Sequence, residues 1–390
     1  MKAGWAIKPL GEVCDVINGG TPKTGVIEYW EGPHQWLTPA EMGKRSTPYV
    51  AKTERSITDA GLQNSSARLL PPQSVILSSR APIGHLVINT SPMATNQGCK
   101  GLVPGNNLDA KYLYYYLAGI VPLLNELGTG ATFKELSGGK LKEVPVPVAP
   151  LPEQHRIGAI LDKVFDGIAT VKANAEKNLQ NARALFESYL QSVFTERGEG
   201  LEETTLGKVC QFVGGSQPPK SVFEKVQTPD NIRLIQIRDY KSDKHIVFIP
   251  RNIAKRFCDA KDVMIGRYGP PLFQILRGLE GAYNVALMKA VPDTSKLSRD
   301  YLFYFLKHSD ILQYVIYHSE RAAGQIGVTK ETLEPFPIAL PHREMQEKLV
   351  AAISEVESET QRLESLCQQK LAALGDLKKS LLHQAFTGEL

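Results

Sequence analysis

The sequence is poor in cysteine, and its cysteines are not placed for a disulfide framework or a structural metal site. Five occur among 390 residues, with no CxxC pair and no cluster of cysteine and histidine at zinc-binding spacing. Isolated cysteines of this kind are usually buried as free thiols. We therefore expect free thiols at Cys14, Cys99, Cys210, Cys258 and Cys367, and no bound metal.

The sequence also lacks a long apolar run. No stretch approaches the roughly 18 to 20 apolar residues that a membrane helix needs. The opening MKAGWAIKPLGE has neither the apolar core nor the small-residue cleavage site of a secretion signal. We therefore expect a cytoplasmic protein without a membrane partner.

Motifs of the common catalytic classes are absent as well. The sequence has no Asn/Asp-Pro-Pro-Tyr/Phe string, with which an amino-methyltransferase holds its target amine. It also has no GxxxxGK phosphate loop followed by Ser or Thr, no HExxH and no GxSxG. We predict that the chain is not an enzyme, with no catalytic residues and no cofactor of its own.

One short pattern resembles that of metal-dependent nucleases. The strings PD (229–230) and DYK (239–241) have the order in which two carboxylates hold Mg²⁺ and a lysine polarises the attacking water. Charged residues are common in this chain, so such a pattern arises easily by chance. The position equivalent to Asp239 in the first half of the chain falls near Gly43, where the pattern is missing. A magnesium-dependent nuclease is therefore the weakest of the alternative functions.

Three blocks of sequence occur twice, in the same order. LGEVCDVINGGTP (10–22) is matched by LGKVCQFVGGSQP (206–218), and YLYYYL (112–117) by YLFYFL (301–306). The third block keeps a separation of 192 residues from Pro145 and Pro337 through to Thr195 and Thr387. Coincidence does not preserve the order of three blocks, so the chain is an internal duplication.

The long segment of each repeat, 1–150 and 199–340, has the pattern of an α+β globular domain. Short runs rich in β-branched residues are separated by Gly, Pro, Asn and Asp, as is typical of strands joined by turns. Strands are expected at 74–80, 84–89, 232–240 and 245–250, and a helix at 109–118 and again at 298–307.

The short segment of each repeat, 151–198 and 341–390, has the pattern of one long helix. Apolar residues recur at alternating steps of four and three, the period of a coiled-coil seam, and no proline interrupts either stretch beyond its first turn. Helices of about 40 residues would be some 60 Å long. The predicted seam consists of Ile157, Leu161, Val164, Ile168, Val171 and Leu185 in the first copy and Leu349, Ile353, Val356, Leu363, Leu374, Leu377 and Leu381 in the second.

Connectivity predicts that the two helices pair antiparallel. The second globular segment begins about ten residues after the first helix ends, so no linker is long enough to return the chain for a parallel pair. The expected fold is two similar α+β domains joined by an antiparallel coiled coil, with an internal pseudo-twofold repeat. In this arrangement the domains would lie at opposite ends of the helical pair.

Charge is distributed unevenly, although the net charge is only +4. Residues 1–150 carry 14 Lys and Arg against 11 Asp and Glu, and residues 201–340 carry 19 against 15, whereas both helical segments are slightly acidic. Two similar basic modules at a fixed separation suit a DNA target with two half-sites. The alternative is a scaffold without DNA, in which a coiled coil joins two protein-binding modules.

Five strings in order carry a resemblance to a known family. They are PLGEVCDVINGGTP (9–22), RAPIGHLVI (80–88), TNQGCKGLVP (95–104), VPVPVAPLPEQHRI (144–157) and SLLHQAFTGEL (380–390). Together with the duplication and the long helices, the whole chain resembles the specificity subunit of type I restriction-modification systems. The second copy departs from the pattern, with PHREMQ (341–346) in place of PLPEQ and RYGPPLF (267–273) in place of RAPIGHL.

The resemblance implies how such a chain would work. It implies two target recognition domains, each reading one half of a bipartite, asymmetric double-stranded DNA target. It also implies spacer helices that dock two methyltransferase (M) subunits, which methylate adenine, and further restriction/translocase (R) subunits. S-adenosylmethionine, ATP and Mg²⁺ are expected on those partner subunits.

Candidate DNA-reading residues follow from the chemistry of base recognition. Arg and Lys recognise guanine, Asn and Gln recognise adenine, and Lys and Arg also hold phosphates. Arg80 and Arg267 rank first because each copy has an arginine at the end of a strand-like run, whereas Asn96 and Asn284 fit equally well as turn residues. The full set is Lys44, Arg45, Arg80, Asn96, Gln97 and Lys134 in the first domain, and Arg233, Gln236, Arg238, Lys241, Arg267, Asn284 and Gln325 in the second.

Four large apolar residues of the helices lie off the predicted seam and recur in both copies. They are Leu190 and Phe194 in the first copy and Leu382 and Phe386 in the second. Apolar side chains outside a two-helix seam need another surface to cover them. We expect them to dock partner helices. The alternative is packing against the adjacent globular domain.

Overall fold

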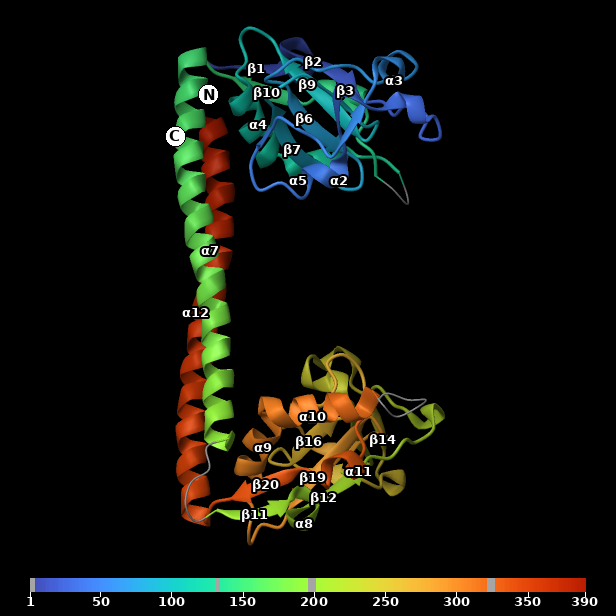
Figure 1. The fold of residues 1–390 in the computed structure, drawn as a ribbon, viewed down its shortest axis with the longest axis vertical. Helices are drawn as coiled ribbons and strands as arrows, with labels where there is room; N and C mark the ends of the chain where they lie inside the picture. The colour runs from blue at the N-terminus through green and yellow to red at the C-terminus, as the bar shows by residue number, and fades with distance from the viewer. Residues whose placement is uncertain (1–3, 131–133, 196–200, 321–326) are drawn as a thin grey trace. The chain divides into compact units, whose positions relative to one another are not determined.

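The computed structural model describes residues 4–130, 134–195, 201–320 and 327–390 (Figure 1). The chain divides into two compact units, Met1–Ala175 with Gln369–Leu390, and Glu176–Gln368. Each unit holds one globular domain and one part of each long helix, α7 (Leu151–Thr195) and α12 (Arg343–Thr387). The predicted α+β class with two long helices is confirmed. No helix in the described ranges is long and apolar enough to cross a membrane.

The first domain is built on two sheets. A five-stranded sheet has the order β2-β9-β6-β7-β4 and is antiparallel except where β4 meets β7, and a three-stranded sheet has the order β5-β3-β8. A separate ribbon pairs β1 with β10. The strands are β1 Ala6–Pro9, β2 Cys14–Asn18, β3 Trp30–Leu37, β4 Tyr49–Val50, β5 Arg55–Ile57, β6 Val75–Ser79, β7 Ile83–Asn89, β8 Met93–Thr95, β9 Cys99–Pro104 and β10 Pro145–Val148.

Helices cover one face of the five-stranded sheet. The predicted helix at 109–118 is α4, which begins where the Asp109 side chain accepts a hydrogen bond from Tyr112 N at 2.8 Å. Tyr112 and Leu113 from α4 are fully buried with Leu77 and Leu102 from the sheet. The helices of this domain are α1 Leu10–Val13, α2 Pro39–Met42, α3 Asp59–Gln63, α4 Ala110–Gly119, α5 Val121–Leu127 and α6 Gly138–Lys142, with a 3-10 turn η1 at Ile27–Tyr29.

The second domain repeats this plan. Its main sheet has the order β12-β19-β16-β17, a second sheet has the order β14-β13-β18-β15, and β11 pairs with β20 as a ribbon. The strands are β11 Glu202–Thr205, β12 Cys210–Gly214, β13 Asn231–Ile235, β14 Phe248–Pro250, β15 Phe257–Cys258, β16 Val263–Gly266, β17 Gln274–Leu276, β18 Gly281–Tyr283, β19 Leu287–Pro292 and β20 Pro337–Leu340. The helices are α8 Leu206–Val209, α9 Arg299–Lys307, α10 Ser309–Glu320 and α11 Lys330–Leu333, with 3-10 turns η2 Lys220–Val222, η3 Ile237–Tyr240, η4 Asp243–His245 and η5 Arg251–Ile253.

Two of the predicted strands in the second domain are shorter than expected. The strand expected over 232–240 ends at Ile235, because Gln236 and Asp239 form a capping box that starts η3. The strand expected over 245–250 is reduced to Phe248–Pro250, since η4 takes up Asp243–His245. By contrast, β6, β7, α4 and α9 lie where the sequence pattern predicts them.

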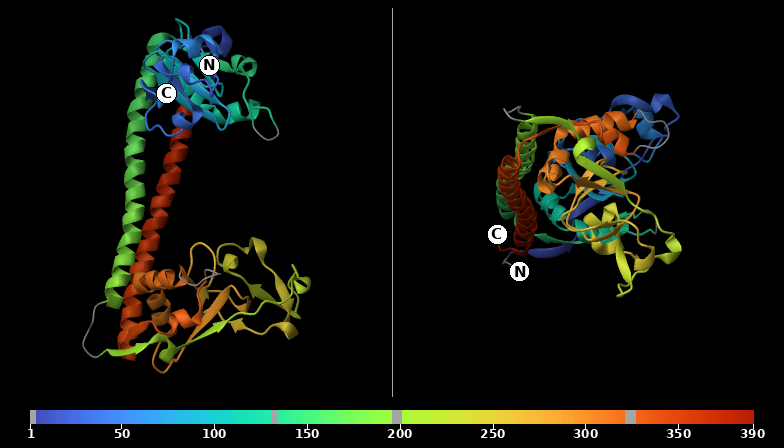
Figure 2. Two further views of the ribbon diagram at one scale, coloured as in Figure 1. Left: turned by 45° about the vertical axis from the view of Figure 1, so that its right-hand side comes forward. Right: turned by 90° about the horizontal axis from the view of Figure 1, so that it is seen from below.

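The helices α7 and α12 run antiparallel within each unit, side by side in both views (Figure 2). In the first unit Ile157 and Leu161 share a core with Leu382 and Ala385. In the second unit Arg183 Nε donates to Glu364 Oε1 at 3.0 Å, while Leu190 shares a core with Ile353. In both units the residue number rises along one helix as it falls along the other.

The buried stripe of α7 departs from the predicted seam in its second half. The stripe of buried and half-buried side chains runs through Ile157, Leu161, Val164, Ile168, Val171, Ala175, Leu179, Ala182, Phe186, Leu190 and Val193, which is 36 residues in ten steps. That period of 3.6 is the period of a straight helix, which drifts by about 20° per heptad relative to a 3.5-residue repeat. The predicted seam member Leu185 is consequently 62% exposed, and its counterpart Leu377 is 46% exposed. Leu363, also assigned to the seam, is 42% exposed.

Candidate nucleic-acid interface

The repeated Gly-Gly string of each domain lies against the turn that follows β8 or β18. A Cβ on Gly19 would lie 2.0 Å from Asn96 O, and a Cβ on Gly215 would lie 1.9 Å from Asn284 O. No side chain fits at either position, so both repeats need glycine there. The equivalent backbone hydrogen bonds, Gly19 N to Cys99 O at 3.1 Å and Gly215 N to Leu287 O at 3.0 Å, fix the same close approach in the two domains.

Asn96 and Asn284 are turn residues of this shared framework. The Asn96 side-chain oxygen accepts from Gly98 N at 2.7 Å, and that of Asn284 accepts from Ala286 N at 3.2 Å. This is the hydrogen bond by which asparagine mimics a backbone turn. The two asparagines therefore hold the turns, which present the neighbouring side chains.

In the first domain the turn gathers three of the candidate reading residues. Gln97 accepts a hydrogen bond from the Thr21 hydroxyl, and Asn96 Nδ2 donates to the same hydroxyl oxygen at 3.1 Å. Arg80 lies beside them, because a Cβ on Gly98 would lie 3.0 Å from Asn96 Oδ1 and 3.1 Å from Arg80 Nε. We call Thr21, Arg80, Asn96 and Gln97 the first-domain cluster.

The remaining candidates of the first domain have contacts elsewhere. Lys44 Nζ lies 3.4 Å from Glu54 Oε1 on the surface. Arg45 donates to Glu41 Oε1 at 2.5 Å and to Lys52 O at 2.6 Å, so its guanidinium is held by protein groups. Lys134 is exposed. None of the three shares a hydrogen bond or ion pair with the described residues of the first-domain cluster.

In the second domain Arg267 ties two segments of the backbone together. Its Nε donates to Val328 O at 2.9 Å and its Nη1 donates to Val285 O at 3.3 Å, next to the Asn284 turn. The guanidinium carbon lies 5.1 Å from the centre of the Tyr268 ring, within the range of a cation–π contact. Arg267 therefore holds the turn in place, and part of its guanidinium group remains at the surface.

Arg80 and Arg267 are not equivalent, although the sequence suggested that they are. Ser79 N donates to Gly98 O, and Ser79 O accepts from Leu136 N; Arg267 makes the matching pair of bonds with Ala286 O and Val328 N. Arg267 therefore occupies the position of Ser79, and Arg80 lies one residue further along. Successive residues of a strand point to opposite faces, so the two arginines present different chemistry in the two domains.

Four candidates of the second domain lie at the end of β13 and in the turn that follows. Arg233 donates to Asp243 Oδ1 at 3.1 Å, whereas Arg238 and Lys241 are exposed. Gln236 begins η3, and its side-chain nitrogen is buried without a partner. Gln325 lies outside the described residues.

The nuclease-like pattern falls in the same turn, with a structural role for its buried acid. Asp239 accepts from Gln236 N at 3.0 Å, and burial raises the pKa of its carboxyl. Its counterpart in the first domain is Glu41, two residues before Gly43, which is also buried and lies in the equivalent turn, where the Thr38 side chain accepts from Glu41 N at 3.2 Å. Across the described ranges no group of three or more His, Cys, Asp or Glu side chains could hold a metal ion.

The four apolar residues expected to dock partners pack instead against the neighbouring domain. Leu190 and Leu382 are buried in the two main cores. The Phe386 ring centre lies 5.0 Å from that of Tyr112 and 5.2 Å from that of Tyr116, and the Phe194 ring lies 5.3 Å from that of Tyr301. These residues therefore join the end of each long helix to a domain, which is the alternative that the sequence left open.

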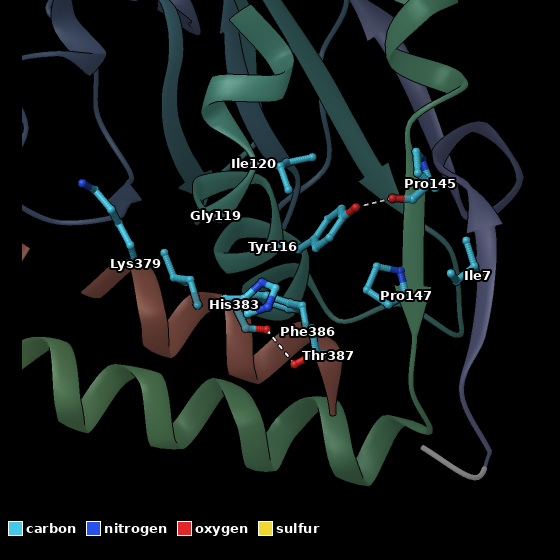
Figure 3. A pocket seen from close by; sticks show the side chains of 11 residues that line it. Ile7, Tyr116, Gly119, Ile120, Pro145, Pro147, Lys379, His383, Phe386 and Thr387 are labelled. Atoms are coloured by element: carbon cyan, nitrogen blue, oxygen red, sulfur yellow. Dashed lines mark hydrogen bonds between the residues drawn. The ribbon is translucent and has the colours of Figure 1, made fainter. Parts of the chain in front are cut away.

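An apolar cleft remains beside this contact in the first unit. It measures about 310 Å³ and is lined by Ile7, Ile120, Pro145 and Phe386 among others (Figure 3). In the second unit the position of Gly119 is taken by His308, whose ring packs 5.4 Å from Phe194 and 6.1 Å from Phe336. The histidine occupies the space that the glycine leaves open.

Comparison with known proteins identifies the family. The model for the type I restriction modification DNA specificity domain matches residues 2–181 and again residues 198–372. Those two matches span most of the chain, and the chain therefore belongs to this family. The two matches also correspond to the two halves of the internal duplication.

Several curated relatives are specificity subunits of type I restriction enzymes. The MjaIX subunit of Methanocaldococcus jannaschii is 29% identical over 282 residues, which cover 63% of this chain and 65% of the relative. An Escherichia coli subunit is 30% identical over 48% of each chain. The chain thus spans from about half to just under two thirds of these two relatives. The EcoKI subunit of Escherichia coli is 23% identical over 99% of this chain and 89% of its own.

Solved structures show the same fold. One from a study of assembly and conformational transition of the type I R-M system has a TM-score of 0.81 at 19% identity, covering 100% of this chain and 99% of its own. The HsdS subunit of Thermoanaerobacter tengcongensis has a TM-score of 0.61 at 19% identity, covering 100% and 98%. The predicted fold, with its tandem repeat, is therefore confirmed.

Proposed function

We propose that this chain is the DNA-recognition subunit of a type I restriction-modification complex, in which each globular domain reads one half of a bipartite, asymmetric target. The observation that carries the proposal is a shared framework with different side chains. Both domains hold an equivalent glycine, Gly19 or Gly215, against the same asparagine turn, but Arg80 and Gln97 flank that turn in the first domain, and Tyr268 and Val285 stand at those positions in the second. Identical scaffolds with different base-reading chemistry suit two half-sites of different sequence.

The proposal assigns the chemistry to partners. Two methyltransferase subunits would methylate adenine with S-adenosylmethionine, and restriction subunits would use ATP and Mg²⁺. A net charge of +4 is small for tight DNA binding by one chain, because neutralised phosphates dominate affinity. We therefore expect the methyltransferase subunits to close around the duplex. We also propose that α7 and α12, which contribute to both units, set the spacing between the half-sites.

Methylation mapping tests the proposal directly. The chain is co-expressed with the methyltransferase subunit of its system in a host without other adenine methylation, and methylated adenines are mapped across the genome. The expected result is one motif of two short specific parts separated by a fixed number of unspecified bases. Methylation without this chain, or a motif with a single part, would contradict the proposal.

A binding experiment distinguishes the proposed DNA-recognition subunit from a scaffold that does not bind DNA. The complex of this chain and methyltransferase should shift duplex DNA in a salt-dependent manner, as expected for contacts to phosphates. The chain alone should bind the same duplex weakly. A complex that forms but ignores duplex DNA at low salt would favour the scaffold.

A further inference from the structure

A buried lysine of the first domain has no partner among the described residues. Lys100 lies on β9, paired with Asn18 on β2 and with Leu77 on β6, and is only 7% exposed. Its side chain points to the same face of the sheet as Leu102, two residues on, which belongs to the main core with Leu77. Lysine is almost never buried to this extent unless it is paired.

The charged end of this side chain is nevertheless not fully enclosed. In the part of the chain that the structure describes, no hydrogen bond or ion pair reaches the Lys100 ammonium. Its nitrogen is also not among the fully enclosed atoms that lack a partner. The stem therefore packs along the core, and the nitrogen is not fully enclosed, as is usual when a lysine covers apolar surface.

A second cation, Arg80, interacts electrostatically with Lys100. Arg80 follows β6, and its Nη1 lies 3.9 Å from Glu135 Oε2, too far for a short hydrogen bond. Burial lowers the pKa of Lys100, with Glu135 acting against this effect and Arg80 adding to it. The site thus combines two cations and one carboxylate, and within the described ranges no hydrogen bond uses the donors of either cation. A ligand rich in hydrogen-bond acceptors would pair with the donors of Lys100 and Arg80.

The equivalent positions of the second domain hold no such pair. Asn18 faces Lys100 in the first domain, and Gly214 faces Met288 at the equivalent place in the second. Arg80 is likewise replaced by Tyr268. A contact to phosphate would be equally useful at both half-sites, because the sugar-phosphate backbone of DNA is the same in each. A pair of donors that only the first domain has at these positions suits a feature of one half-site, namely a base.

We propose that Lys100 and Arg80 read a guanine in the half-site bound by the first domain. Guanine presents two adjacent acceptors, O6 and N7, in the major groove, and Arg and Lys are the usual residues that recognise them. Asn96 and Gln97 lie on the adjoining turn, so the pair stands beside the other polar groups of the first-domain cluster. This inference rests on the proposed function, and it adds a residue that the sequence pattern did not single out.

The first test is the Lys100→Met variant, which places the residue of the second domain at this position and keeps an apolar stem of similar length. The variant is co-expressed with the methyltransferase and its methylation motif is mapped. We expect one guanine position in one half of the motif to relax, with the other half unchanged. Lys52→Met, at an exposed lysine of the same domain, is the matched control and should leave the motif as it is.

The second test uses the wild-type complex, so that it does not depend on the folding of a variant. Binding is compared between the target duplex and duplexes with 7-deazaguanine, which lacks the N7 acceptor, at each guanine of the first half-site in turn. One substitution should weaken wild-type binding roughly tenfold, about the size of one lost base contact. The Lys100→Met complex, which keeps Arg80, should discriminate less between that duplex and the unmodified one than the wild-type complex does.

Each other outcome overturns the inference. An unchanged motif shows that Lys100 does not read a base, and uniform weakening without relaxation shows a phosphate contact. Wild-type binding that tolerates 7-deazaguanine everywhere, or a wild-type half-site without guanine, also overturns it. In these cases the two-part motif remains and the proposed function stands. If the wild-type chain directs no two-part methylation, the proposed function itself fails.

Discussion

Gln154 and Gln346 make the same three hydrogen bonds, one glutamine in each unit. Both side chains are fully buried at the start of a long helix. Each amide nitrogen donates to the carbonyl five residues earlier and to the loop before the main domain helix, and each amide oxygen accepts from that loop. The distances are 2.7, 2.9 and 2.8 Å for Gln154, and 2.9, 2.7 and 2.9 Å for Gln346. These bonds fix where each helix leaves its domain.

Replacing Gln346 with leucine should destabilise the second unit. The change removes three hydrogen bonds and leaves buried backbone groups, including Ser298 N, without partners. The expected loss is on the order of 2 to 4 kcal/mol of unfolding free energy. Calorimetry of the full chain measures it. Gln180→Leu on the exposed side of α7 is the control, and an equal effect of the two changes would contradict the anchoring role.

The exposed leucines of the helices test the corrected helical stripe. Leu185 and Leu377 occupy equivalent positions, and both face solvent. Leu185→Ser and Leu377→Ser should therefore change the unfolding free energy by less than about 0.5 kcal/mol each. Leu190→Ala, on the buried stripe, should cost roughly 2 to 5 kcal/mol. If the two serine variants are as unstable as Leu190→Ala, the buried residues follow the predicted 3.5-residue seam instead of the 3.6-residue stripe.

The sequence predicted the two long helices because their apolar period holds over some 40 residues and both copies share it. It could not show where the stripe shifts from Leu185 to Phe186, because near that point α7 packs against a globular domain as well as against α12. The equivalence of Arg80 and Arg267 failed for a similar reason. A register difference of one residue depends on hydrogen bonds between distant segments, such as Arg267 N to Ala286 O, and no local pattern encodes them.

The candidate site, too, could be predicted from the sequence only where a local pattern recurs. The Gly-Gly string and the asparagine turn could be found by sequence because they recur. Lys100 could not be singled out, since a lysine between Cys99 and Gly101 looks like any surface charge until the sheet pairs it with Leu77. The four apolar residues of the helices were recognised as repeated, but only the fold shows that a domain covers them.

Stability should depend on pH through Glu357. Burial alone would raise the pKa of this carboxyl, but hydrogen bonds from Lys307 and Tyr304, each 2.7 Å long, lower it overall. A lowered pKa in the folded state contributes stability that is present above the ordinary value of 4.5 and is lost as the pH falls below it. Glu357→Gln should therefore cost about 1 to 2 kcal/mol at pH 7 and progressively less below pH 4.5.

The measurement for Glu357 is chemical unfolding of wild type and variant across the acid range. Glu359→Gln is the matched control, because Glu359 pairs with Arg362 on the exposed surface and should contribute less than about 0.5 kcal/mol. A gap between wild type and Glu357→Gln that stays constant with pH would show that the carboxylate charge does not stabilise the fold.

Independent reading by the two domains is tested at Arg267. The Arg267→Ala change removes the hydrogen bonds to Val328 O and Val285 O and with them the support of the Asn284 turn. Recognition should weaken or relax only in the half-site of the second domain. If the change costs as much binding energy as the loss of one base contact, the methylation rate should fall roughly tenfold. Rates on targets altered in either half measure this effect. Arg362→Ala, on the exposed face of α12, controls for lost charge, and equal loss in both halves with folding intact would mean that the domains do not read separately.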